Sequence, residues 1–302
     1  MQAMRAFLKE VFLLSALVGT LSAPCLAAPI PPNLKKVVTF ILIESGHSDL
    51  VPIGTGFFVG IRDSTDPGLT WGYFVTARHV LTRPTDGHLW PEVFLRVNKQ
   101  AGGIHTGRLA LVAEGPDKSV FFHPDSTVDL AVVPIVPDVE QYDFLVIPDS
   151  MITSRDKFAD LGVVEGADVF FIGLFTLYLG EAQNYPVVRF GRVALATTEK
   201  VSWNGLLMDL YLMETFAYGG NSGAPVFFYL GVDRQPGSIF VGTPELYLAG
   251  VMMGAFQDVT PVYELEAAGK QVSLSNMGIA AVVPAYKLRE LLFGEELSGR
   301  RR

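Results

Sequence analysis

The sequence contains a single cysteine among 302 residues, and this scarcity excludes several classes of protein. One thiol cannot form a disulfide framework within the chain or a metal cluster held by several thiolates. Charge is also sparse, because Asp, Glu, Lys and Arg make up only 18% of the residues, and the net charge is −8. A chain short of basic residues lacks the charge that binds phosphate backbones, so we expect no nucleic-acid partner.

What the chain has in quantity is apolar side chains. Hydrophobic residues make up 49% of the sequence, which is too many for a disordered protein. A chain of 302 residues is long enough to bury one large core or two modest ones. We therefore expect a folded protein of one or two domains.

An uncharged, mostly apolar run lies near the N-terminus. Arg5 and Lys9 precede the 13 mostly apolar residues Val11–Ala23, and small residues follow up to Ala28. This order of a basic region, an apolar region and a cleavage site is typical of a secretory signal peptide. We predict a signal peptide over residues 1–28 and an exported protein, either periplasmic or extracellular.

Two other interpretations of this segment fit less well. A membrane anchor needs about 20 apolar residues, so we expect no stable membrane insertion once the signal is cleaved. A lipoprotein would use Cys25, but Pro24 stands before it where a small residue is expected. Cleavage after Ala28 leaves a mature chain without cysteine, which excludes a cysteine nucleophile.

Short runs of Val, Ile, Leu, Phe and Tyr, bounded by Gly, Pro, Asp or Asn, recur along the rest of the chain. Runs of this kind at close spacing predict an all-β sandwich or barrel. The expected strands are Val37–Ile43, Gly56–Val59, Tyr73–Thr76, Val93–Val97, Arg108–Val112, Leu130–Ile135, Val169–Ile172, Val187–Phe190, Arg192–Ala196, Leu206–Leu212, Ala224–Tyr229, Leu246–Met252 and Ile279–Val283.

Three segments of the chain differ from this β pattern. Glu140–Gly162 resembles a strand less and predicts a connection between two β domains, residues 29–145 and 146–302. Pro284–Phe293 begins with proline, precedes Gly294 and predicts a short helix near the C-terminus. We expect the last residues, Ser298–Arg302, to form a frayed end.

Three short segments carry residues suited to nucleophilic catalysis. His79 follows an expected strand in Gly72–Leu81, Asp129 opens the apolar segment that ends at Ile135, and Ser222 lies in the glycine-rich Gly219–Val226. A serine nucleophile needs a base, a group that orients the base and donors for the developing oxyanion. Histidine, carboxylate and glycine-rich backbone supply these functions.

The order of these residues restricts the class of hydrolase. None of the five histidines follows Ser222, which excludes the serine-before-histidine order of α/β-hydrolases. A subtilisin order would place an aspartate before His79, but no aspartate there opens a strand. The order His, Asp, Ser has support for each member, with Asp125 as a nearby alternative to Asp129.

The three segments together resemble the motifs of a known family. Thr76-Ala-Arg-His79, Asp129-Leu-Ala-Val and Gly220-Asn-Ser-Gly-Ala-Pro225 are similar to those of chymotrypsin-fold serine peptidases, and to the bacterial trypsin-like group that includes the HtrA proteases. The resemblance implies two six-stranded antiparallel β-barrels with the active site between them. It implies His79 as general base, Asp129 as its orienting group and Ser222 as nucleophile.

The resemblance also implies further site residues. Backbone N–H groups of Gly220 and Ser222 would form the oxyanion hole. The substrate pocket would have Phe216 at its base and a wall formed by Met253, Gly254 and Gly278. An apolar base suggests a small or apolar residue before the scissile bond.

Two departures from the family separate this chain from some of its members. Asn221 replaces the aspartate that binds the new N-terminus of activated digestive enzymes, so we expect no maturation by that route. Only residues 285–302 follow Pro284, so we expect no PDZ domain.

We therefore predict an exported serine endopeptidase that acts on peptide or protein substrates without a cofactor. An alternative is a catalytically silent binding module that retains the peptidase fold. His47, His88, His105 and His123 show no metal-ligand spacing with carboxylates, so we expect no metal site.

Overall fold

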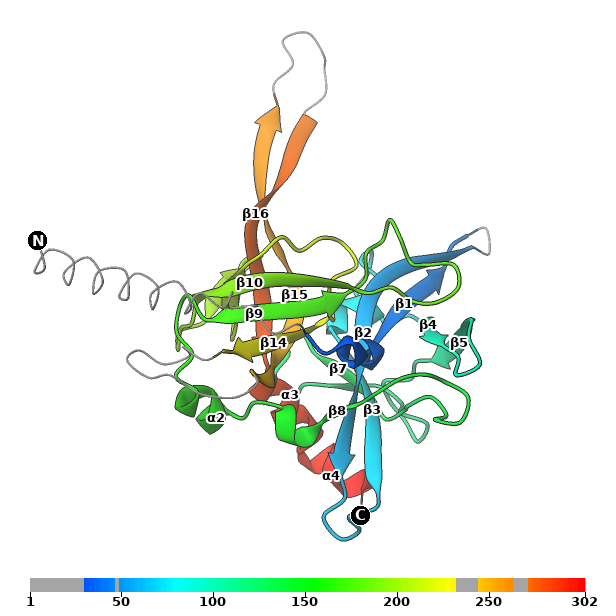
Figure 1. Ribbon diagram of the computed structural model, residues 1–302. Coiled ribbons are helices and arrows are strands. Elements are labelled where there is room, and N and C mark those ends of the chain that lie inside the picture. The colour runs from blue at the N-terminus through cyan, green and yellow to red at the C-terminus, as the bar shows by residue number, and fades with distance from the viewer. Residues whose placement is uncertain (1–29, 47–48, 232–243, 263–270, 302) are drawn as a thin grey trace, which may run out of the picture. The chain divides into compact units, whose positions relative to one another are not determined.

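The architecture is that of a computed structural model, which describes residues 30–46, 49–231, 244–262 and 271–301 (Figure 1). The predicted signal peptide lies outside these ranges. Contacts group the chain from Pro32 onward into one unit, and the predicted domain boundary between residues 145 and 146 stays a prediction.

The first half of the described chain forms an eight-stranded sheet in the order β5-β4-β1-β2-β3-β7-β6, with β8 paired to β2. Its pairs are antiparallel except for β2 and β8. Its elements are η1 (Pro32–Val37), β1 (Val38–Glu44), β2 (Leu50–Arg62), β3 (Thr70–Thr76), η2 (Arg78–Leu81), β4 (Glu92–Asn98), β5 (Ile104–Ala110), β6 (Phe121–Phe122), β7 (Ala131–Val133) and β8 (Ile147–Pro148).

The second half contains a closed barrel of six strands in the order β10-β13-β16-β15-β14-β9, with β11 and β12 paired outside it. Its elements are η3 (Asp149–Met151), α2 (Arg155–Asp160), β9 (Asp168–Gly173), β10 (Val187–Leu195), β11 (Val201–Trp203), β12 (Leu206–Met208), β13 (Tyr211–Glu214), β14 (Pro225–Leu230), β15 (Glu245–Val262), β16 (Gln271–Pro284), α3 (Ala285–Leu292) and α4 (Glu295–Arg300). The predicted all-β fold is confirmed.

Each half has its own apolar core, built from the strands that the hydrophobic runs predict. In the first, Phe58 and Phe74 of neighbouring strands are buried with their ring centroids 5.9 Å apart. In the second, Tyr211 of β13 and Phe228 of β14 are buried with their ring centroids 6.2 Å apart. Burial of such aromatic side chains dominates core energetics and holds the strands that carry the candidate site.

The hairpin of β15 and β16 is longer than the sequence pattern predicts. The two strands continue past Met252 and pair as far as Val262 with Gln271 (Figure 1). Register shifts between Met252 and Gly254, and again between Ala255 and Gln257, interrupt the pairing. Such bulges break the alternation of period two that marks a strand in the sequence, which explains the missed extension.

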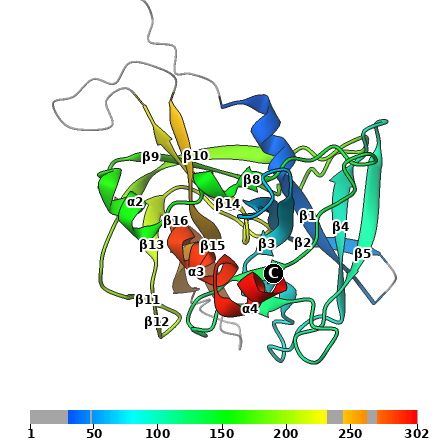
Figure 2. The same ribbon diagram turned by 90° about the horizontal axis from the view of Figure 1, so that it is seen from below.

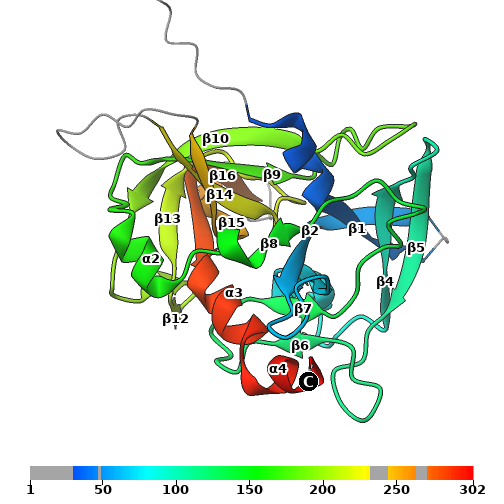
Figure 3. The same ribbon diagram turned by 60° about the horizontal axis from the view of Figure 1, so that its bottom comes forward.

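The expectation of a frayed end was wrong for the described part of the C-terminus, because residues 298–300 belong to α4 (Figures 2 and 3). The Arg301 guanidinium donates to the Tyr73 hydroxyl at 2.6 Å and to the Leu292 carbonyl at 2.8 Å. Arg301 therefore links the end of α4 to β3. No helix among the described residues is long and apolar enough to cross a bilayer.

Candidate active site

The pairing of β3 with β7 brings the histidine and aspartate segments together. Thr76 at the end of β3 is opposite Ala131 at the start of β7. His79 follows β3 in the short helix η2, and Asp129 precedes β7 by two residues. Because antiparallel strands place one strand's end beside the other's beginning, both side chains lie at the same edge of the sheet.

His79 and Asp129 are in direct contact. His79 Nδ1 lies 2.6 Å from Asp129 Oδ2, and the backbone N–H of His79 donates to Asp129 Oδ1 at 2.9 Å. A carboxylate only accepts, so the ring carries a proton on Nδ1 and, when neutral, leaves Nε2 free to accept. Asp125, the alternative, instead accepts from Thr127.

The environment of the imidazole raises its proton affinity. Partial burial by itself lowers the pKa of His79, but the hydrogen bond to Asp129 and the negative charge of that residue raise it above the usual histidine value. The His79 side chain is 49% exposed, whereas Asp129 is buried. A carboxylate beside an imidazole favours the imidazolium in this way.

Ser222 lies in a tight turn before β14. Asn221 is buried, accepts from the Tyr218 N–H at 2.8 Å and donates to the Leu174 carbonyl at 2.6 Å. Gly220 has φ +91° and Gly223 has φ +84°. Residues other than glycine rarely adopt this left-handed backbone conformation. These bonds and glycines explain why this sequence forms a turn with the serine near its centre.

The serine turn packs directly against the histidine segment. A Cβ added to Gly223 would collide with Thr76 Oγ1 and would lie 3.1 Å from the Ala77 nitrogen. Ala77 precedes His79 by two residues, so the segments that bear the candidate base and nucleophile are in contact. The three predicted residues thus lie on segments that the fold brings together.

The Ser222 hydroxyl donates to the Met253 carbonyl at 2.9 Å. Within the described ranges it forms no hydrogen bond with His79, and the N–H groups of Gly220 and Ser222 have no acceptor. Hydrogen bonds between catalytic groups are often long or poorly aligned in ligand-free enzymes and tighten when substrate binds. Free N–H groups are what an oxyanion hole requires.

Thr55 on β2 is a site residue that the sequence analysis missed. Its buried Oγ1 donates to the Gly220 carbonyl at 2.7 Å and accepts from the Leu174 N–H at 2.9 Å. Its own backbone N–H donates to the Ser222 carbonyl at 2.9 Å. Nothing local in residues 54–57 of the sequence indicates that the threonine hydroxyl contacts a turn 165 residues away.

Replacing Thr55 with valine is expected to destabilise the protein, because the Gly220 carbonyl and the Leu174 N–H both lose a buried partner. Each buried polar group left unpaired costs about 1–3 kcal/mol. Thr39→Val is the matched control, since the Arg96 carbonyl that it leaves still accepts from Asn184. Urea denaturation of both variants measures the difference, and equal stabilities would contradict this role of Thr55.

The predicted substrate pocket is only partly assembled by the described residues. A Cβ on Gly278 would lie 3.9 Å from the Phe216 ring, which is 57% exposed. The Met253 carbonyl accepts a hydrogen bond from the Ser222 hydroxyl, whereas Gly254 packs against Trp203. Phe216 therefore lines an open surface here.

Residues outside this site have structural partners. Arg78, beside His79, places its guanidinium 4.6 Å from the centre of the Phe122 ring. His88 lies near Asp86, His105 near Tyr142 and His123 near Glu290, while His47 is outside the described ranges. Across the described part of the chain, no group of three potential metal ligands occurs.

Comparison with known proteins agrees with this fold. The family model for the trypsin-like peptidase domain matches residues 54–231, which is more than half of the chain. The chain therefore belongs to the trypsin-like peptidase family and has the chymotrypsin fold that its motifs predict. Membership implies peptide or protein substrates.

Individual relatives are distant. No curated protein matches the chain. Among solved structures, it is similar to the ligand-free MamO protease domain from Magnetospirillum magneticum, with 17% sequence identity and a TM-score of 0.48. That match covers 86% of this chain and 97% of the other.

Proposed function

We propose that this protein is an exported serine endopeptidase in which Ser222 is the nucleophile, His79 the general base and Asp129 the group that orients the base. The observation that carries the proposal is the contact of His79 Nδ1 with Asp129 Oδ2 at 2.6 Å, on a segment packed against the serine turn. Membership of a peptidase family adds support.

In the proposed reaction, Ser222 Oγ attacks the carbonyl carbon of the scissile peptide bond and His79 Nε2 takes its proton. The oxyanion that forms accepts from the N–H groups of Gly220 and Ser222. The peptide C–N bond then breaks, and His79 returns the proton to the leaving amine. Water repeats the sequence on the acyl-enzyme and releases Ser222.

Covalent labelling with a fluorophosphonate tests this proposal, because such probes react only with an activated and accessible serine. We expect the purified protein without residues 1–28 to be labelled and Ser222→Ala to remain unlabelled. Labelling of both would show that another serine reacts. A folded wild-type protein that takes no label would contradict the proposal.

One observation favours the alternative of a catalytically silent binding module. The Ser222 hydroxyl donates to the Met253 carbonyl rather than to His79. In a peptidase this bond must break when substrate arrives, whereas in a silent module it would persist. Labelling kinetics with and without a bound peptide therefore separate the two functions.

Activity is expected to depend on the protonation of His79. Because Asp129 raises the pKa of His79, protonated imidazolium persists to higher pH than for an ordinary histidine, and it cannot accept the serine proton. We expect kcat/KM to fall about tenfold per pH unit below that pKa, in the one-proton limit. Rates with a peptide ester from pH 5 to 8 measure the profile, and a flat profile would contradict this role of His79.

The proposal extends to substrate and location. The exposed Phe216 ring beside Gly278 suits a small or apolar side chain before the scissile bond. The pattern of residues 1–28 supports export to the periplasm or the extracellular space. The mass of the protein recovered from an exporting host tests cleavage after Ala28.

A further inference from the structure

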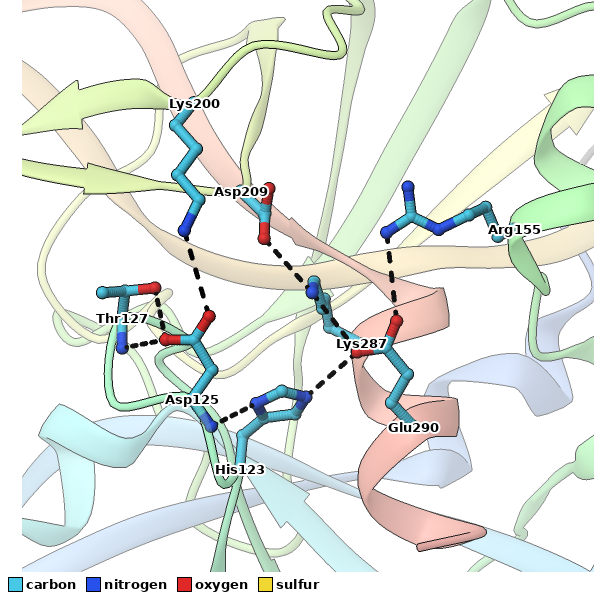
Figure 4. A network of polar contacts seen from close by, with 8 residues as sticks. All are labelled: His123, Asp125, Thr127, Arg155, Lys200, Asp209, Lys287 and Glu290. Carbon is cyan, nitrogen blue, oxygen red and sulfur yellow. Dashed lines mark hydrogen bonds and ion pairs between the residues drawn. The ribbon is translucent and has the colours of Figure 1, made fainter.

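A network of polar contacts joins helix α3 to the segment that precedes Asp129 (Figure 4). Its centre is Lys287 of α3, a buried residue whose Nζ lies 3.2 Å from Asp209 Oδ2 and 3.2 Å from Glu290 Oε2. Burial by itself lowers the pKa of Lys287, but the hydrogen bond to Asp209 and the charge of Glu290 raise it above its usual value. The lysine is therefore charged and restricts the Glu290 carboxylate.

His123 connects that carboxylate to the polypeptide backbone. Its buried ring accepts from the Asp125 N–H through Nδ1 at 3.1 Å, and its Nε2 lies 3.3 Å from Glu290 Oε2. A backbone N–H can only donate, so Nδ1 must be unprotonated and the ring proton must lie on Nε2, where it donates to Glu290. One imidazole thus links α3 to the backbone of residue 125 (Figure 4).

From residue 125 the chain runs through a tight turn to Asp129. The Val128 N–H donates to the Asp125 carbonyl at 3.0 Å, and the Leu130 N–H donates to the Val128 carbonyl at 3.0 Å. Asp129 lies between these two bonds. Its backbone therefore follows the position of the turn that His123 holds.

The Asp129 carboxylate has little else to hold it. In the described structure, both of its hydrogen-bond donors, the Nδ1 and the backbone N–H, belong to His79. No residue other than His79 donates a hydrogen bond to this carboxylate within those ranges. The carboxylate can orient His79 only as well as its own backbone is placed.

We propose that His123 and Glu290 are positioning residues for Asp129, and that they act by fixing the turn before it against helix α3. The proposal rests on the proposed function of the His79–Asp129 pair. Neither residue touches the candidate nucleophile or base. A displacement of about 1 Å in a reacting group can cost about 10²-fold in rate, so a positioning contact of this kind has a measurable effect.

Two variants of Glu290 separate contact from charge. Glu290→Ala removes the acceptor for His123, whereas Glu290→Gln retains a carbonyl oxygen there and removes only the charge. If the contact positions Asp129, Glu290→Ala lowers kcat by up to about 10²-fold and Glu290→Gln stays close to wild type. His123→Phe removes both bonds of the imidazole and should match Glu290→Ala.

A matched control comes from the neighbouring helix. Glu296 of α4 pairs with Lys118 at 2.6 Å, which also ties a C-terminal helix to the first half of the chain but does not reach the Asp129 turn. We expect Glu296→Ala to keep the wild-type rate. The exposed positions of Glu290 and Glu296 favour folding of their variants, and circular dichroism checks it.

The decisive readout is the titration of the His79 ring, followed by ¹⁵N NMR of the imidazole. Since Asp129 raises the pKa of His79, displacing Asp129 must lower it. We expect Glu290→Ala and His123→Phe to lower this pKa, while Glu290→Gln and Glu296→Ala leave it unchanged. A change that only destabilised the fold would not move the His79 titration of the folded state.

Each outcome decides the proposal. A wild-type His79 titration in folded Glu290→Ala would overturn it, and so would an equal shift in Glu290→Gln, because charge and not contact would then be responsible. If His123→Phe fails to fold, the comparison of Glu290→Ala with Glu290→Gln decides the proposal. A wild-type protein that takes no fluorophosphonate label, yet shows the expected titrations, would refute the peptidase function and leave the positioning role standing.

Discussion

Replacing Ser222 with alanine is expected to lower kcat for peptide hydrolysis by about 10⁶-fold, the size of loss that follows removal of the nucleophile in a serine peptidase. The reason is that no covalent intermediate can form, while binding and the oxyanion donors remain. The variant should fold normally, because among the described residues the lost hydroxyl makes one hydrogen bond, to the Met253 carbonyl. That bond contributes about 1 kcal/mol.

The measurement is single-turnover hydrolysis of a peptide substrate, with thermal unfolding recorded beside it. Ser202→Ala is the matched control, since Ser202 is exposed on β11 and outside the candidate site. Ser202→Ala should keep the wild-type rate. Activity of Ser222→Ala within tenfold of wild type would show that the nucleophile lies elsewhere.

Replacing Asp129 with asparagine is expected to lower kcat by about 10⁴-fold with the fold intact, as the same change does in the serine-peptidase triad. The carbonyl oxygen of the asparagine can still accept from the backbone N–H of His79. Its NH₂ group, however, would face the ring atom Nδ1 of His79 as a donor. Nδ1 would then have to accept, which moves the ring proton to Nε2. A protonated Nε2 cannot take the proton of Ser222.

Asp125→Asn tests whether the correct aspartate has been chosen. Asp125 lies four residues away, and its carboxylate accepts from Thr127 without contacting His79. We expect its loss of activity to be far smaller than that of Asp129→Asn. The reverse order of the two effects would transfer the orienting role to Asp125. Steady-state rates on the high-pH plateau of each variant's own pH profile make the comparison.

The sequence predicted most of the strands because their apolar side chains repeat in short runs that end at Gly, Pro, Asp or Asn. It predicted α3 as well, from the proline at its start and the glycine beyond its end. It did not predict the extension of β15 and β16, where bulges break the alternation. Nor did it predict α4, which is held by contacts of Arg301 with residues such as Tyr73, far away in the chain.

The sequence by itself determined the residue types of the candidate site and their order. His79 and Ser222 each lie in a local pattern, a strand end or a glycine-rich turn, whose chemistry can be read without knowing its neighbours. Only the tertiary structure shows that Asp129, and not Asp125, contacts His79, because that contact depends on the register of β3 against β7. It also gives the partners of Thr55 and Glu290, which lie 165 and 167 residues away in the chain, since such pairings arise only when the strands and helices pack.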